Sequence, residues 1–183
     1  MKIFYIGILM ILLMLISGCA QNENTTDFLS NYDSAKYVSY TNDDGVFKVT
    51  LFIQEGPYYH DKHINIYSTL EYFGDNELVE IWHGIPYFSY TIFDGKDYYS
   101  EAITFTILKR TVLEKGVIYT IPFKKAGGYS QDDPDADFWE VYYNDKELKL
   151  PTGEYQITAS CEFWLTQGGS TYENSIVIEI EVN

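Results

Sequence analysis

The chain has few cysteines and few basic residues. Only two cysteines, Cys19 and Cys161, occur in 183 residues, which excludes the disulfide-dense scaffold of many small secreted domains. Lys and Arg number 12 against 27 Asp and Glu, and the formal net charge is −15. Because binding to nucleic acid depends on cationic contacts with phosphate, this charge balance argues against a nucleic-acid partner.

Sequence signatures of several enzyme classes are also missing. The chain contains no G-x-S-x-G nucleophile elbow, no glycine-rich phosphate loop and no H-E-x-x-H zinc motif. A glycoside hydrolase needs only two carboxylates that the fold brings together, and the 27 acidic residues leave that alternative open. We therefore expect a protein without catalytic activity, with a β-sandwich glycoside hydrolase as the last alternative.

The N-terminal residues have the pattern of an export signal. One basic residue, Lys2, precedes an apolar run over residues 3–16, and the small residues Ser17 and Gly18 follow. A membrane-spanning helix needs roughly 20 apolar residues, so this run is too short to be one. A short basic region, an apolar stretch and small residues are typical of a processed signal peptide. We predict a signal peptide over residues 1–18.

The run Leu15-Ile16-Ser17-Gly18-Cys19 resembles the lipobox of bacterial lipoproteins. The resemblance implies cleavage by signal peptidase II between Gly18 and Cys19, and a diacylglyceryl group on the Cys19 sulfur. Two acyl chains on one residue are enough for stable membrane anchoring. The expected location is extracytoplasmic, at the cell membrane, with polar residues 19–35 as a flexible tether. Cys161 is then left without a disulfide partner.

Residues 36–183 have the pattern of a single all-β domain. Runs rich in β-branched and aromatic residues alternate with turns rich in Gly, Asn and Asp. The alternation of apolar and polar residues is clearest in the last two runs, and no segment shows a helical period. Short strands at regular spacing predict an antiparallel sandwich. The strands we expect are 46–53, 63–72, 78–82, 87–93, 103–108, 117–121, 138–143, 155–163 and 176–182.

The segment Leu150-Pro151-Thr152-Gly153-Glu154-Tyr155 resembles the L-P-x-G-x-Y motif before the penultimate strand of many bacterial immunoglobulin-like domains. The resemblance implies an immunoglobulin-like antiparallel β-sandwich with Tyr155 packed at its corner. The longer upstream part implies additional strands. The layout is also similar to small exported proteinase-inhibitor domains of Gram-positive bacteria, so proteinase inhibition is one alternative function, without an assigned residue.

Tyrosine is unusually frequent, with 18 residues. Its side chain offers rigid, amphipathic contact area for recognition of proteins or glycans. In a strand, each tyrosine doublet places one ring inside and one outside. We interpret the protein as a cell-surface binding module for a protein or glycan, although the rings can equally fill the core. The candidate binding residues are Tyr58, Tyr59, Tyr98, Tyr99, Tyr129 and Trp139.

Three aspartates, Asp133, Asp135 and Asp137, have a D-x-D-x-D spacing that can gather carboxylates around Ca²⁺. The spacing departs from an EF-hand, because Phe138 stands where glycine is needed and Asn144 where glutamate is needed. Calcium-dependent binding is therefore an alternative function. The competing interpretation is a solvated acidic loop.

Two further groups have simpler interpretations. His60 and His63 have a spacing used in zinc sites, but residues three apart on a strand point to opposite faces, so we expect surface histidines. We expect His83 to pack against its neighbours. Cys161 lies in a predicted strand, where a buried small apolar side chain is expected.

Overall fold

The computed structural model describes residues 36–101, 103–125 and 127–183. The predicted signal peptide, the predicted lipidation site Cys19 and the predicted tether lie outside these residues. Within the described ranges, no helix is long and apolar enough to cross a membrane. The described chain is mostly β, with two antiparallel sheets packed together, so the predicted all-β sandwich is confirmed.

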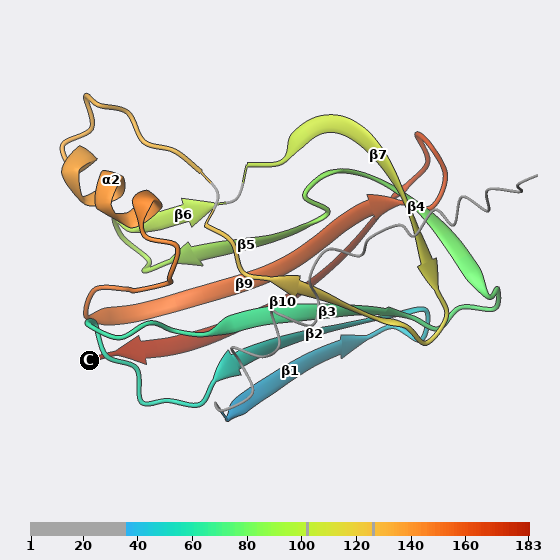
Figure 1. Ribbon diagram of the computed structural model, residues 1–183, viewed down its shortest axis with the longest axis horizontal. Coiled ribbons are helices and arrows are strands. Elements are labelled where there is room, and N and C mark those ends of the chain that lie inside the picture. Colours follow the sequence, from blue (N-terminus) through green and yellow to red (C-terminus); the bar gives the residue numbers. More distant parts are fainter. Residues whose placement is uncertain (1–35, 102, 126) are drawn as a thin grey trace, which may run out of the picture.

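The first sheet contains four antiparallel strands (Figure 1). Alternation between core and solvent is clearest in the second of these strands, where four of the eight positions are fully buried and face the other sheet. In spatial order the strands are β1 (Tyr37–Asp43), β2 (Phe47–Gln54), β3 (Ile66–Tyr72) and β8 (Ile118–Pro122).

The second sheet is built around β9 (Gly153–Trp164). One edge of β9 pairs along its whole length with β10 (Thr171–Val182). The other edge pairs with β5 (Phe88–Phe93) and touches β4 (Leu78–Ile85) at one position. Two outer strands, β6 (Tyr99–Glu101) and β7 (Phe105–Glu114), pair with β5 and β4 respectively.

The strands β4, β5, β6 and β7 form the two arms of one long hairpin. The pairing register is the same at the two ends of the hairpin, at Leu78↔Glu114 and at Phe93↔Tyr99. Between these ends the register is offset by two residues at Ile85↔Phe105, and the offset begins between His83 and Ile85, where the hairpin bends. Figure 1 shows β5 and β6 at one end of the sandwich and the β4–β7 arms at the other.

This strand order is that of an immunoglobulin-type sandwich. In the strand lettering of immunoglobulin domains, one sheet contains strands A, B and E, which correspond to β2, β3 and β8. The other sheet contains strands C, F and G, which correspond to β5, β9 and β10. β1 and β7 are additions at the sheet edges, which confirms the predicted additional strands. Tyr155 is buried at the start of β9, as the motif implied.

The core lies between the sheets. Phe47 of β2 packs edge-on against Phe163 of β9, with 5.1 Å between the ring centroids, and Tyr172 of β10 stacks on Phe163. Cys161 is fully buried beside this group, as predicted for a small apolar side chain.

One secondary-structure prediction is wrong. Residues 138–143 lie in a helix, α2 (Ala136–Asn144), and not in a strand. The segment is rich in aromatic residues, which favour strands, but its aromatics also recur four positions apart. Phe138 stacks with Tyr142, and Trp139 stacks with Tyr143. Packing of this stripe against the sandwich decides the helical conformation.

Candidate functional site

Three of the six predicted binding residues lie around α2. Tyr98 is a core residue with 6% exposure, and its ring centroid is 5.2 Å from that of Trp139. Tyr129 stacks on Tyr143 of the helix. These rings attach α2 to the end of the sandwich, with Tyr98 in the core and Trp139 partly buried against it. A binding role for Trp139 and Tyr129 stays a prediction.

The other three predicted residues are elsewhere. Tyr58 is half-buried and donates a hydrogen bond to the carbonyl of Gln54 at 2.7 Å, and Tyr59 is exposed beside it. Tyr99 is exposed on β6, where its hydroxyl donates to the Glu101 carboxylate at 2.9 Å. The structure therefore does not bring the six aromatic residues together into one face.

The three aspartates of the D-x-D-x-D segment lie at the start of α2. The Asp133 carboxylate accepts a hydrogen bond from the Asp135 amide, Asp135 precedes the helix, and Asp137 lies in its first turn. Negative charge in this position is favourable because the helix dipole is positive there. In the described part of the chain, no three His, Cys, Asp or Glu side chains are grouped to hold a metal ion.

The histidines follow the interpretations given to them. His60 and His63 are exposed in the loop before β3. The His60 Nδ1 atom is 3.3 Å from the Asn183 carbonyl oxygen, and the His63 Nδ1 atom is 3.9 Å from Glu147 Oε2. His83 is buried at the hairpin bend and packs edge-on against Tyr87.

The outer side of the second sheet is open to solvent, and we call it the open face. It consists of the outward side chains of β5, β6, β9 and β10, which alternate with buried ones. The outward positions include no Lys or Arg. Its acidic members are Glu101, Glu154, Glu162, Glu173, Glu179 and Glu181.

Four of these glutamates face each other in pairs across β9 and β10. Glu162 stands directly opposite Glu173, and Glu154 directly opposite Glu181. Directly opposed residues have Cβ atoms about 5 Å apart, and like charges there are destabilising. None of the ion pairs among the described residues includes these four glutamates. The two pairs therefore break a local rule of sheet stability, and natural proteins break such rules mainly at functional sites.

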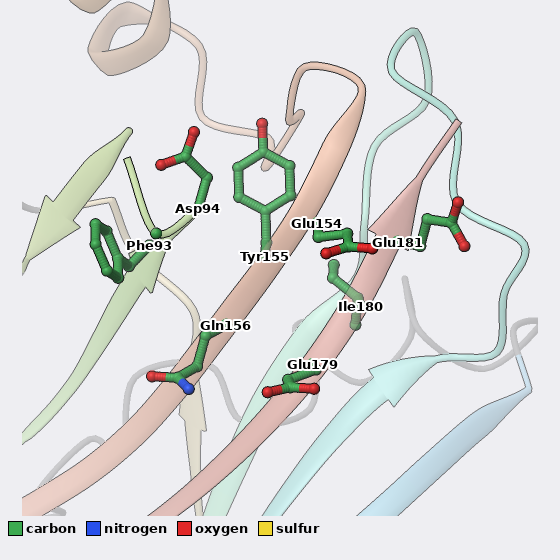
Figure 2. A pocket seen from close by; sticks show the side chains of 9 residues that line it. Phe93, Asp94, Glu154, Tyr155, Gln156, Glu179, Ile180 and Glu181 are labelled. Atoms are coloured by element: carbon green, nitrogen blue, oxygen red, sulfur yellow. The ribbon is translucent and has the colours of Figure 1, made fainter. Parts of the chain in front are cut away.

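One end of the open face is hollowed. Figure 2 shows this hollow, of about 530 Å³, with Glu154, Glu179 and Glu181 around it and Tyr155 beside Asp94. Burial, together with the nearby Asp94 charge, raises the pKa of Tyr155, so its hydroxyl stays neutral. The Asp94 carboxylate accepts hydrogen bonds from the backbone amides of Lys96 and Tyr98, which fixes the turn that borders the hollow.

The arrangement of these carboxylates favours binding over acid–base chemistry. A glycosidase holds two carboxyl groups on opposite sides of a bond, one of them in an apolar pocket that keeps it protonated. Here Glu154 and Glu181 lie side by side on neighbouring strands, and both are exposed. An exposed row of carboxylates instead presents a negative surface to a cationic partner.

The open face was not identified from the sequence, although part of the signal was there. The alternation in residues 154–164 and 171–182 already places the glutamates on the outward side. What it does not give is which residue of β9 stands opposite which residue of β10, because that register depends on the turn between them.

We expect Glu173→Gln to stabilise the protein. The change removes one charge of the Glu162–Glu173 pair, so the free energy of unfolding should rise by about 0.2–1 kcal/mol, and by less in high salt. Glu179→Gln is the matched control, because Glu179 stands opposite Gln156. Urea unfolding of the full chain measures both. Equal effects of the two changes would show that the opposed pair carries no repulsion.

Comparison with known proteins adds no family. No protein-family model matches the chain, and a search of curated proteins gives no significant match.

Proposed function

We propose that the protein is a non-catalytic binding module, exported and anchored to the cell membrane by lipid on Cys19, which binds a basic protein segment through the open face. The lipobox-like run before Cys19 supports the anchor. The open face supports the binding role, because the outward side chains of β9 and β10 are exposed or half-buried and present glutamates, hydroxyls and aromatic edges. No feature of the described residues favours proteinase inhibition, calcium-dependent binding or glycoside hydrolysis.

The main support for this proposal comes from the two opposed glutamate pairs, Glu162–Glu173 and Glu154–Glu181. Each pair costs stability in the free protein, and a cation placed between the two carboxylates removes the repulsion. Charge complementarity of this kind gives specificity and fast association. The excess of acidic over basic residues also repels the domain from an anionic membrane leaflet, which leaves its faces available to a protein partner.

Neutralising the hollow should weaken binding of a basic probe. In the triple variant Glu154→Gln, Glu179→Gln, Glu181→Gln, we expect a lysine decapeptide to bind the full chain at least about tenfold more weakly at low salt. Calorimetric titration at two salt concentrations measures the loss. Because the contacts are ionic, the difference between variant and wild type should shrink as salt increases.

The control removes the same charge from another surface. Glu55, Asp75 and Glu77 are exposed in loops outside the open face, so their neutralisation to Gln, Asn and Gln should change the affinity far less. Equal weakening by both triple variants would mean that the probe senses only total charge, and the proposal for the open face would be wrong.

A further inference from the structure

A second hollow, of about 330 Å³, lies at the border between the open face and the β4–β7 arms, where the long hairpin bends. We call it the bend pocket. Its wall is formed by Phe105 and Leu108 of β7 on one side and by Glu162 and Trp164 of β9 on the other, with Gly84 between them. Its volume is at the lower end of the range for small-molecule sites.

The pocket exists because the hairpin arms lose their regular pairing at this point. His83 pairs with Lys109 and Ile85 with Phe105, so residues 106–108 bulge opposite Gly84. A Cβ atom on Gly84 would lie 2.6 Å from Thr104 Cγ2 and 2.8 Å from the Phe105 carbonyl oxygen. Glycine is therefore needed for this close approach. Bulges of this kind often lie beside functional sites, where they redirect side chains.

A buried histidine fixes the bend. His83 Nδ1 donates to the Gly84 carbonyl, and its Nε2 accepts from the Thr111 hydroxyl at 2.8 Å. Burial lowers the pKa of His83, so the ring stays neutral and keeps both bonds. The bend pocket is thus built on a rigid support.

The lining has an apolar part and a single charge. Phe105 is 61% exposed and Leu108 is also exposed. The Trp164 indole is oriented by its Nε1 hydrogen bond to Thr171 Oγ1 at 3.0 Å. Glu162 is the one charged residue of the lining, and its opposed partner Glu173 adds further negative potential.

We infer that the bend pocket receives the side chain of a lysine or arginine. The methylene stem of such a residue packs along Phe105 and Leu108. Its cationic group is attracted by the Trp164 ring and pairs with Glu162. The inference rests on the proposed function, because the lysine or arginine belongs to the basic segment bound along the open face.

The negative charge around the bend pocket favours a cationic side chain over a neutral sugar as its ligand. An indole ring beside hydroxyl groups also suits a neutral sugar, but the opposed Glu162 and Glu173 carboxylates favour a cation over a neutral ring. A segment with alternating lysines can lie along the strands and reach both the bend pocket and the acidic hollow. We therefore assign the pocket to a protein side chain, with a glycan as an outcome of the test.

The test is calorimetric titration of the full chain with a decapeptide of alternating lysine and glycine. We expect Glu162→Gln to weaken binding by about tenfold or more, and Trp164→Leu, which keeps apolar bulk but removes the ring, by several-fold. Glu181→Gln is the matched control, because it removes one charge of the open face outside the pocket, and about a twofold effect is expected. Acetylation of the lysines of the peptide should abolish binding.

The outcomes separate the two proposals. If the wild-type chain does not bind the lysine peptide at low salt, both are wrong. If it binds, but Glu162→Gln and Glu181→Gln weaken binding equally and Trp164→Leu has no effect, the pocket assignment is wrong and the open face remains. Binding of an N-acetylglucosamine oligomer without binding of the lysine peptide would replace the assignment by a glycan. Melting temperatures of the variants show that each is folded.

Discussion

Tyr98→Ala is expected to destabilise the protein strongly, whereas Tyr99→Ala is expected to have a small effect. The two residues are neighbours in sequence, but Tyr98 is 6% exposed and Tyr99 is 51% exposed. Truncation of a large buried aromatic side chain costs about 3–5 kcal/mol. Loss of an exposed cross-strand aromatic contact, such as that of Tyr99 with Phe93, costs less than about 1 kcal/mol.

The large cost follows from the contacts of Tyr98. Its ring centroid is 5.2 Å from that of Trp139 and 5.8 Å from that of Tyr142 on α2, and 5.3 Å from that of Tyr155 on β9. The ring therefore joins the helix to the second sheet. α2 has only nine residues, too few for an isolated helix to be stable in water, so its conformation depends on this packing.

Urea unfolding of the full chain, followed by circular dichroism, measures both changes. Tyr98→Phe is the control for the ring, because it removes only the hydroxyl and keeps the ring contacts, so it should cost far less than Tyr98→Ala. If Tyr98→Ala and Tyr99→Ala cost the same, the attachment of α2 through Tyr98 would be contradicted.

The tyrosine doublet shows how far sequence reasoning extends. Alternation along a strand correctly predicts that one ring of Tyr98-Tyr99 faces the core and the other faces solvent. Which ring faces inward depends on the pairing of β6 with β5, which is set by the turn at Asp94. The aromatic residues of α2 fit both a strand and a helix, and only contacts with distant residues decide between them.

The candidate site could not be predicted from the sequence, because it also depends on contacts between distant residues. The outward glutamates can be read from alternation, but the pairs depend on the register of β9 with β10. The bend pocket joins Gly84, Leu108 and Trp164, which are far apart in the chain. Nothing local in the sequence marks such a juxtaposition, because it results from the bulge and the strand order together.

A count of reactive thiols is expected to separate the lipid-anchored protein from its unmodified form. Cys161 is fully buried, and burial raises the pKa of its thiol to about 12. A rise of about three units above the ordinary value lowers the thiolate fraction about 10³-fold at neutral pH, and the thiolate is the reactive species. In the folded protein Cys161 should therefore not react with a thiol reagent such as iodoacetamide.

Cys19 then determines the count. If the Cys19 sulfur carries a diacylglyceryl group, the exported native protein should show no reactive thiol, and denaturation should reveal one, at Cys161. The chain made by cell-free synthesis, without lipid transfer, should show one thiol when native and two when denatured. Mass spectrometry of the labelled peptides identifies which cysteine has reacted, so the two cysteines are measured independently.

Cys19→Ala completes the test, because it should remove the proposed anchor and leave the fold of residues 36–183 unchanged. We expect no processed, lipid-carrying form of this variant in the membrane fraction. The variant should show no reactive thiol when native and one when denatured. A native label on Cys19 of the exported wild-type protein would refute lipid attachment. A native label on Cys161 in the variant would instead refute the burial of Cys161, since the packing of β9 against β2, and not the lipid, keeps that thiol from reagent.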